Sequence, residues 1–255
     1  MPLHLINLHL LVLVLSNCFQ SIHTETSFEV ILQSSGSWSK DEWIEHSGRI
    51  PELKEFTACH WEKLMYFARH SNDIWSYCIL RATNKEKLRC LQFAHKGNLT
   101  SAYRSVIAYG WLSGWTDQPI GINFPVYSFR HRAWNHFCWS YSSITGINKA
   151  YHNGKLIGTV SFVDEYGTRG PSMDRSEDVY ESALIIGQEP NDGMKGGYSA
   201  ARAFPGDIAE LHVWNRIITD DEILQLARCK SGMKGIAMLK TLISSVAVSV
   251  PSEAT

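Results

Sequence analysis

The acidic and histidine residues of this chain lack the spacing of the common hydrolytic sites. Glycoside hydrolysis needs two carboxylates facing each other at ~5–9.5 Å, but the acids between residues 174 and 181 lie in a polar segment, not on an alternating strand. Neither a Gly-x-Ser-x-Gly elbow nor a His-Glu-x-x-His helix occurs. His131 and His136 flank Trp134 beside a predicted strand, which favours a structural or exposed role. We therefore expect a binding protein and not an enzyme.

Composition excludes partners that are held by charge alone. The chain has 255 residues with 24 Lys and Arg, 25 Asp and Glu, and a net charge of −1. Such a balance leaves no field that would gather nucleic acid or an anionic membrane. Hydrophobic residues reach 44% and aromatic residues 11%, which suits a packed core built on pleated sheets. We expect a folded, mostly β protein with no nucleic-acid partner.

Residues 1–18 are predicted to be a secretory signal peptide. An apolar stretch around Leu8 to Leu15 precedes Ser16-Asn17-Cys18, a small-x-small pattern typical of signal peptidase sites. A buried strand or an uncleaved anchor is the alternative, but the stretch is short for a bilayer that needs ~20 apolar residues. The sequence therefore predicts a secreted, extracellular protein without a membrane span.

Five cysteines follow the predicted cleavage site, and secreted thiols oxidise where the fold brings them together. Cys78 and Cys90 lie on two strand-like segments joined by a short polar stretch, so a hairpin would place them opposite each other. Two separately buried thiols are the alternative. Cys59 would then pair with Cys138, and Cys229 would pair with another chain or stay buried.

Asn98-Leu99-Thr100 fits the sequon for N-glycosylation. It follows Lys96-Gly97, a turn signal that suits an exposed loop. Asn98 is therefore a candidate glycosylation site, although such triplets are common by chance.

Short strand-like runs separated by turn signals recur along the chain, which is typical of an antiparallel sandwich in one domain. Asn153-Gly154 lies between two of these runs and predicts a tight hairpin, because both residues tolerate positive φ. Residues 235–250 are expected to form one or two closing strands, since Lys240 and three serines disfavour the alternative of a membrane anchor. The remaining predicted runs are residues 28–32, 56–67, 74–80, 88–93, 105–111, 134–142, 148–151, 156–162, 183–187 and 207–214.

One helix is predicted from residue 219 to about residue 228. Thr219 and Glu222 form a capping box, and Ile218 and Ile223 occupy the positions of a hydrophobic staple. Ile223, with residues 224 and 227, gives the helix an apolar stripe that can dock on a sheet.

The chain resembles the pentraxin family of secreted calcium-dependent lectins. Residues 136–143 follow the family signature His-x-Cys-x-Ser/Thr-Trp-x-Ser/Thr, except that Tyr141 stands where the family has Trp. Residues 184–189, Gly196-Gly197 and residues 204–214 are similar to the family's calcium loop and the strand after it. The resemblance covers roughly residues 28–250, and we place the pentraxin-like domain at residues 26–250.

The resemblance implies an all-β, two-sheet antiparallel jelly-roll sandwich, concanavalin A-like, with one short helix. Cys59 matches the first half of the family disulfide, and the signature Cys138 matches the second half. The family is often assembled in rings, which implies a cyclic homo-oligomer.

A calcium site is also implied, with Asn84, Glu189, the carbonyl of Pro190, and Asp192 as ligands. Thr83 stands where the family has the first acid, and Asn191 is an alternative to Asp192 in the loop. Calcium takes six to eight oxygens, usually with several carboxylates. We therefore expect one strong calcium site at most, and an ordinary polar loop is the alternative.

The second calcium site of the family is not expected to form, because Ser199, Ala200 and Arg202 occupy its region. A guanidinium cannot coordinate a cation. Arg202 is instead a candidate for binding a phosphate or carboxylate ligand, or it is a solvated loop residue. The resemblance thus predicts a secreted pattern-recognition lectin for surface glycans or phosphorylated head groups, through calcium. The alternative is a metal-independent adhesion or interaction module on the same fold.

Overall fold

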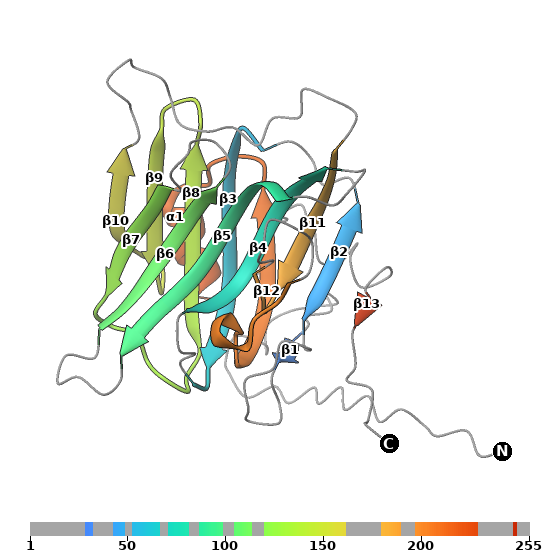
Figure 1. Ribbon diagram of the computed structural model, residues 1–255. Coiled ribbons are helices and arrows are strands. Elements are labelled where there is room, and N and C mark those ends of the chain that lie inside the picture. Colours follow the sequence, from blue (N-terminus) through green and yellow to red (C-terminus); the bar gives the residue numbers. More distant parts are fainter. Residues whose placement is uncertain are drawn as a thin grey trace, which may run out of the picture.

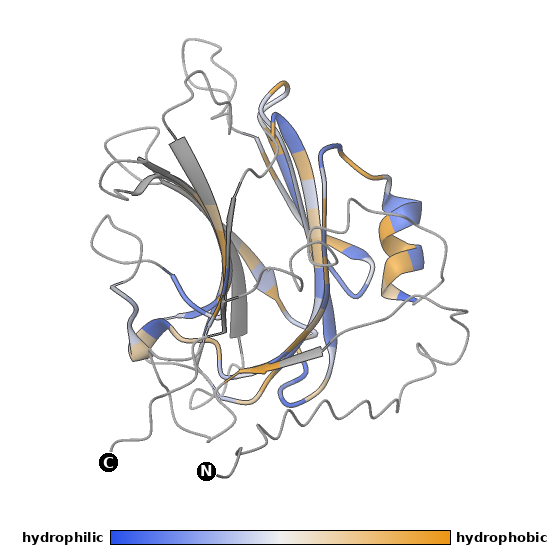
Figure 2. Cartoon of the chain, turned by 90° about the vertical axis from the view of Figure 1, so that its right-hand side faces the viewer, coloured by the Kyte–Doolittle hydropathy of each residue, from blue (hydrophilic) through white to orange (hydrophobic). Residues whose placement is uncertain are grey.

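The computed structural model describes residues 29–32, 43–48, 53–66, 71–81, 87–98, 105–113, 120–161, 180–189, 197–228 and 247–248. Their strands form two antiparallel sheets that face each other (Figures 1 and 2). The six-stranded sheet has the order β1 (Glu29–Leu32), β12 (Gly206–Trp214), β3 (Glu55–Leu64), β8 (Asn135–Ser142), β9 (Ile147–His152) and β10 (Lys155–Ser161). The seven-stranded sheet has the order β13 (Ala247–Val248), β2 (Ile44–Gly48), β11 (Tyr180–Ile186), β4 (Asn72–Arg81), β5 (Lys87–Asn98), β6 (Ser105–Ser113) and β7 (Ile120–Val126). The expected sandwich is confirmed.

The core lies between the sheets and is centred on aromatic side chains from both. Phe56 and Trp139 of the six-stranded sheet meet edge to face, with ring centroids 5.0 Å apart. Trp139 stacks on Trp75 of the other sheet at 5.9 Å, and Trp75 stacks on Phe93 at 6.1 Å. Each of these side chains is at most 3% exposed. This aromatic row joins the two layers, because alternate residues of each strand point inward.

Helix α1 (Asp220–Ala227) packs on the outer face of the six-stranded sheet (Figure 2). Its start is fixed by the expected capping box, in which Thr219 accepts a hydrogen bond from the Glu222 N–H and Glu222 accepts one from the Thr219 N–H. The staple residues Ile218 and Ile223 are buried at 1% and 0% exposure. They pack with Trp214 and the Cys59–Cys138 disulfide, so the helix shields this disulfide from water.

Both expected cysteine pairs lie opposite each other on neighbouring strands. Cys59 on β3 pairs with Cys138 on β8, and Cys78 on β4 pairs with Cys90 on β5. The Asn153-Gly154 turn also forms as predicted, with φ values of 50° and 78°. The signal peptide, Cys229 and most of residues 235–250 lie outside the described residues, apart from β13. Among the described residues, no helix has the length and apolarity to cross a membrane.

Strands β2 and β7 were not predicted. β7 contains Pro125, and proline lacks the N–H that a central strand needs, so the sequence argued against a strand here. β7 is an edge strand of the sheet, where proline is tolerated. Asn98 is the last residue of β5 and pairs with Ser105, while the other two sequon residues lie outside the described chain. Glycosylation of Asn98 stays a prediction.

The two disulfides should differ in their contribution to stability. They close segments separated by 79 and 12 residues, so the chain-entropy model gives about 4.5 kcal/mol for Cys59–Cys138 and about 3 kcal/mol for Cys78–Cys90. Replacing each pair by two alanines and measuring urea unfolding should show the larger loss for Cys59 and Cys138. Equal or reversed losses would mean that these bonds do not act by restricting the unfolded chain.

Candidate functional site

Of the four predicted calcium ligands, only Glu189 lies among the described residues. Asn84, Pro190 and Asp192 fall outside them, so the complete ligand set stays a prediction. Arg202, the predicted anion ligand, is described and lies beside Glu189. The site can therefore be built upward from these two residues and their neighbours.

A glycine turn brings Glu189 onto the outer face of the seven-stranded sheet. Gly187 follows β11 with φ 88°, and a Cβ there would lie 2.4 Å from Leu32 Cδ1, so other residues are excluded by both backbone and space. Its N–H donates to the Ile74 carbonyl at 2.9 Å. Ser76, whose neighbours on β4 point into the core, donates to the Gln188 carbonyl at 3.3 Å. Glu189 is thereby held against the sheet with 7% exposure.

A short 3₁₀ helix, η1 (Ala200–Arg202), presents Arg202 to this carboxylate. Ser199 caps it by accepting a hydrogen bond from the Ala201 N–H at 3.3 Å. The Ala201 carbonyl accepts from the Ser71 N–H at 3.5 Å, which places η1 beside the start of β4. Arg202 Nη1 donates to Glu189 Oε2 in a close ion pair, and the two side chains are 40% and 10% exposed.

Asp73 is a third member of this cluster and was not predicted from the sequence. Its side chain is buried at 2% exposure and hydrogen-bonded to Ser71 and Glu189. Burial and the adjacent negative charge of Glu189 raise the pKa of Asp73 well above its usual range, although the Arg202 guanidinium opposes this. The hydrogen bond to Glu189 acts in the same direction as burial on the pKa of Asp73.

The guanidinium of Arg202 is the cation that the described residues place at the Glu189 carboxylate. A calcium ion bound through Oε2 of Glu189 would have to displace this guanidinium. Of the predicted calcium ligands Glu189 alone is described, so calcium binding stays a prediction.

A second polar cluster lies inside the core and was missed by the sequence analysis. Glu62 on β3 is completely buried, with Oε2 3.1 Å from His60 Nε2 and Oε1 2.7 Å from His95 Nε2. Burial by itself would raise the pKa of Glu62, but the two histidines outweigh it and hold the pKa at about 2. Because His95 belongs to β5, the interaction links the two sheets. No local pattern signals the contact of Glu62 with His95, since β3 and β5 lie far apart in the sequence.

His152 on β9 extends this polar core. Its Nε2 lies 3.0 Å from Asn135 Oδ1, and its Nδ1 lies 2.8 Å from Ser128 Oγ. Burial lowers the pKa of His152 to about 4, with His95 and Arg130 acting in the same direction and Glu62 opposing them. His152 is therefore neutral near pH 7 and serves as a hydrogen-bonding bridge.

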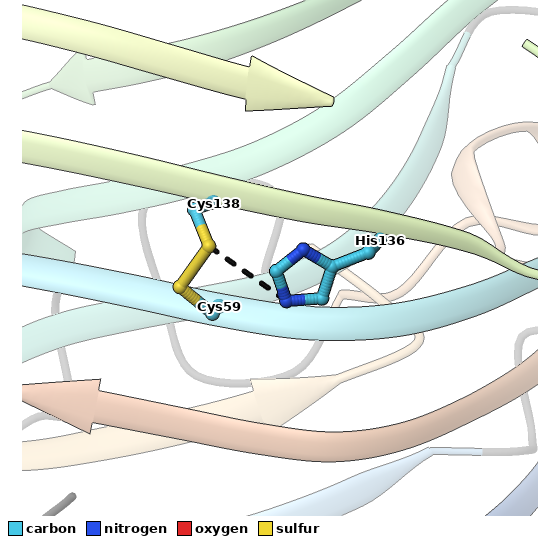
Figure 3. Close-up of side chains that lie close together, drawn as sticks. All are labelled: Cys59, His136 and Cys138. Atoms are coloured by element: carbon cyan, nitrogen blue, oxygen red, sulfur yellow. Dashed lines mark hydrogen bonds between the residues drawn. A yellow bond between two sulfur atoms is a disulfide. The ribbon is translucent and has the colours of Figure 1, made fainter. Parts of the chain in front are cut away.

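The group Cys59, His136 and Cys138 resembles a metal site only by proximity (Figure 3). The two sulfurs form a disulfide, so neither is a thiolate that can bind a metal. His136 Nε2 lies 3.8 Å from Cys138 Sγ, and its ring packs on Trp61 at 5.0 Å. Burial, reinforced by the other histidines, lowers the pKa of His136 to about 3. His136 thus has the structural role that its place in the sequence indicated.

Comparisons with known proteins agree with the sequence pattern. The Pentaxin family model matches residues 119–243. The human neuronal pentraxin receptor is 25% identical over 186 residues, which cover 73% of this chain and 32% of that protein. Rat neuronal pentraxin-1 is 31% identical over 98 residues, which cover 38% of this chain and 20% of that protein. The chain thus matches about a third or less of the length of these relatives.

A solved structure gives the same answer for the fold. The heptameric SAP-like pentraxin from Limulus polyphemus superposes with a TM-score of 0.55 at 20% identity. The match covers 74% of this chain and 77% of that one. The resemblance that the sequence indicated is therefore confirmed.

The polar core should make the fold sensitive to acid. The pKa of His152 lies below its ordinary value of 6.5, so the unfolded chain takes up a proton first, and stability is lost as the pH falls from 6.5 towards 4. This group alone should cost roughly 2 kcal/mol over that range. In His152→Gln, the free energy of unfolding should depend less steeply on pH between 4 and 6.5, by about one proton. An unchanged slope would show that His152 is protonated in the folded state.

The ion pair makes an asymmetric prediction for its two residues. Arg202→Gln leaves the buried Glu189 without a cation and should lower the free energy of unfolding by about 2 kcal/mol. Glu189→Gln should cost less, because the partly exposed guanidinium can turn to water. A double-mutant cycle by urea unfolding should give a favourable coupling energy, and strictly additive losses would contradict the ion pair.

Proposed function

We propose that this chain, which is similar to the pentraxins in sequence and fold, is a secreted recognition module for surface glycans or phosphorylated head groups. Its contact residue is Arg202, on the outer face of the seven-stranded sheet. The observation that carries the proposal is the close ion pair of Arg202 with the buried Glu189, beside the buried Asp73. Binding is accordingly independent of calcium.

Arg202 suits an anionic ligand by its position. The Arg202 side chain is 40% exposed, whereas the Glu189 side chain that pairs with it is 10% exposed. The buried carboxylate therefore orients the guanidinium, and a ligand can reach the guanidinium from solvent. A guanidinium has five N–H donors in a planar fork that matches phosphate and carboxylate oxygens. Holding this fork in place before binding reduces the entropy lost when a ligand is captured.

The disulfides support an oxidising compartment. Both described pairs are buried cystines formed between adjacent strands, and such bonds persist in secreted proteins and are rare in the cytosol. Secretion through the predicted signal peptide at residues 1–18 accounts for them. A cyclic homo-oligomer is part of the same proposal, and light scattering would measure its size.

A binding role also fits the acids better than hydrolysis does. Asp73 and Glu189 share a hydrogen bond and are at most 7% exposed. A pair of glycosidase acids instead needs a gap of ~5–9.5 Å that holds the sugar. These two carboxyl groups leave no such gap.

Retention on immobilised ligands tests the proposal. The secreted protein should bind at least one of phosphocholine, phosphoethanolamine and galactose supports, and EDTA should not release it. Arg202→Gln should lose binding to the phosphate supports by about tenfold, while Arg228→Gln, which removes an exposed charge beyond α1, should bind normally. Release by EDTA would instead support the calcium ligands Asn84, Glu189, Pro190 and Asp192.

A further inference from the structure

The segment between β7 and β8, residues 127–134, is here called the arginine loop, and it is held rigidly from below. The Asn135 side chain accepts from the Arg130 N–H at 3.1 Å and donates to the carbonyls of Arg130 and Ala133 at 2.9 and 2.7 Å. Asn135 is itself completely buried and bonded to His152. The polar core thus fixes the shape of this exposed loop.

The loop also docks on the end of β3. Arg132 donates its N–H to the Leu64 carbonyl at 3.0 Å, and His131 Nε2 lies 2.7 Å from the Met65 carbonyl. Arg132 adopts φ 59°, a left-handed conformation that is unfavourable for a long side chain. Such strain persists only where the surroundings impose it, and it concentrates at binding and catalytic sites.

Two cations of this loop lie without an acidic partner in the part of the chain that the structure describes. Arg130 and Arg132 are both exposed, and neither has a carboxylate partner among the residues that the structure describes. The described cations nearby are used differently, since Lys63 pairs with Asp207 and Arg202 pairs with Glu189. The Arg132 guanidinium lies over the Tyr66 ring, with its central carbon 5.4 Å from the ring centroid. Positive charge is therefore concentrated here and left available.

Three partly or largely exposed aromatic rings belong to this loop or lie against it. Tyr127 begins the loop and is 90% exposed, which is unusual for so large an apolar ring. Tyr66 is 37% exposed, and Trp134 lies under the Lys63 ammonium, 5.5 Å from ring centroid to nitrogen. Exposed rings offer flat faces for the apolar side of a sugar, and guanidinium groups offer paired donors to a carboxylate or sulfate.

We propose that the arginine loop is a binding site for an acidic saccharide, with Arg130 and Arg132 binding its carboxylate or sulfate group and Tyr127 stacking on its ring. The site is built from residues of the arginine loop and not from Arg202, which lies nearby, so it adds a second set of contact residues to the proposed function. Its rigid backbone fits this role, because a ligand meets the charges already in place.

Calorimetric titration of the secreted protein with a heparin-derived hexasaccharide tests the proposal, with lactose as the neutral probe. The double variant Arg130→Gln/Arg132→Gln should lose affinity by about tenfold for each arginine, and lactose should bind weakly or not at all. The control variant Lys155→Gln/Arg228→Gln removes the same charge beside α1 and should keep its affinity. Equal losses of affinity in the two double variants would show that only the net charge matters, and this would overturn the proposal.

Two further variants separate the contributions. Tyr127→Phe should retain binding and Tyr127→Ala should weaken it, whereas equal affinities of the two would remove the stacking contact. Arg202→Gln should bind the hexasaccharide like the wild type. If Arg202→Gln abolishes this binding and the arginine-loop variants do not, the proposal of a second site is wrong, while the proposed function through Arg202 is supported. Unfolding midpoints within the error of the wild type establish that each variant is folded.

Discussion

A carboxylate that leaves water needs a positive charge, a hydrogen-bond donor or a proton, and the buried acids of the described residues find such partners within the chain. Glu62 is completely buried between His60 and His95. Glu189 is paired with Arg202, and burial beside Glu189 raises the pKa of Asp73. An unpartnered charge at any of these positions would cost several kcal/mol, so each group depends on residues from a distant strand or loop.

The pairing of Glu189 with Arg202 differs from the calcium site that the family resemblance implies. The loop after β11 has its turn at Gly187 and its buried acid at Glu189. The region that would supply oxygens to a second ion provides Ser199, Ala200 and Arg202 instead. In the proposed function, the guanidinium beside Glu189 serves in place of an ion, so ligand binding would not respond to the calcium concentration.

The hydrogen bonds of the polar core also reach the arginine loop. Asn135 is bonded to His152 on one side and to the arginine loop on the other. Polar groups that were buried to join the sheets therefore also set the conformation of an exposed segment. A loop whose cations lack an acidic partner among the described residues is costly for stability and useful for recognition, because its hydrogen bonds orient the backbone before a ligand arrives.

Local patterns predicted much of this fold and little of its electrostatics. The capping box at Thr219 and the turn at Asn153 depend on a few adjacent residues, so their structure follows from their sequence. The pairing of Cys78 with Cys90 needed only a hairpin, and the remaining pair then followed. The contacts of Glu62 with His95 and of Asp73 with Glu189 join residues 33 and 116 positions apart in the sequence, and no spacing rule reveals them. The family resemblance supplied Glu189 and Arg202 as candidates, but only the geometry showed that they bind each other.

A crystal structure of the secreted protein grown in millimolar calcium examines the Glu189–Arg202 pair most directly. We expect the Arg202 guanidinium to remain within hydrogen-bonding distance of the Glu189 carboxylate, with no ion between this acid and residues 84 and 192. A calcium ion bound to Glu189 at ~2.3–2.6 Å, with Arg202 turned away, would contradict it.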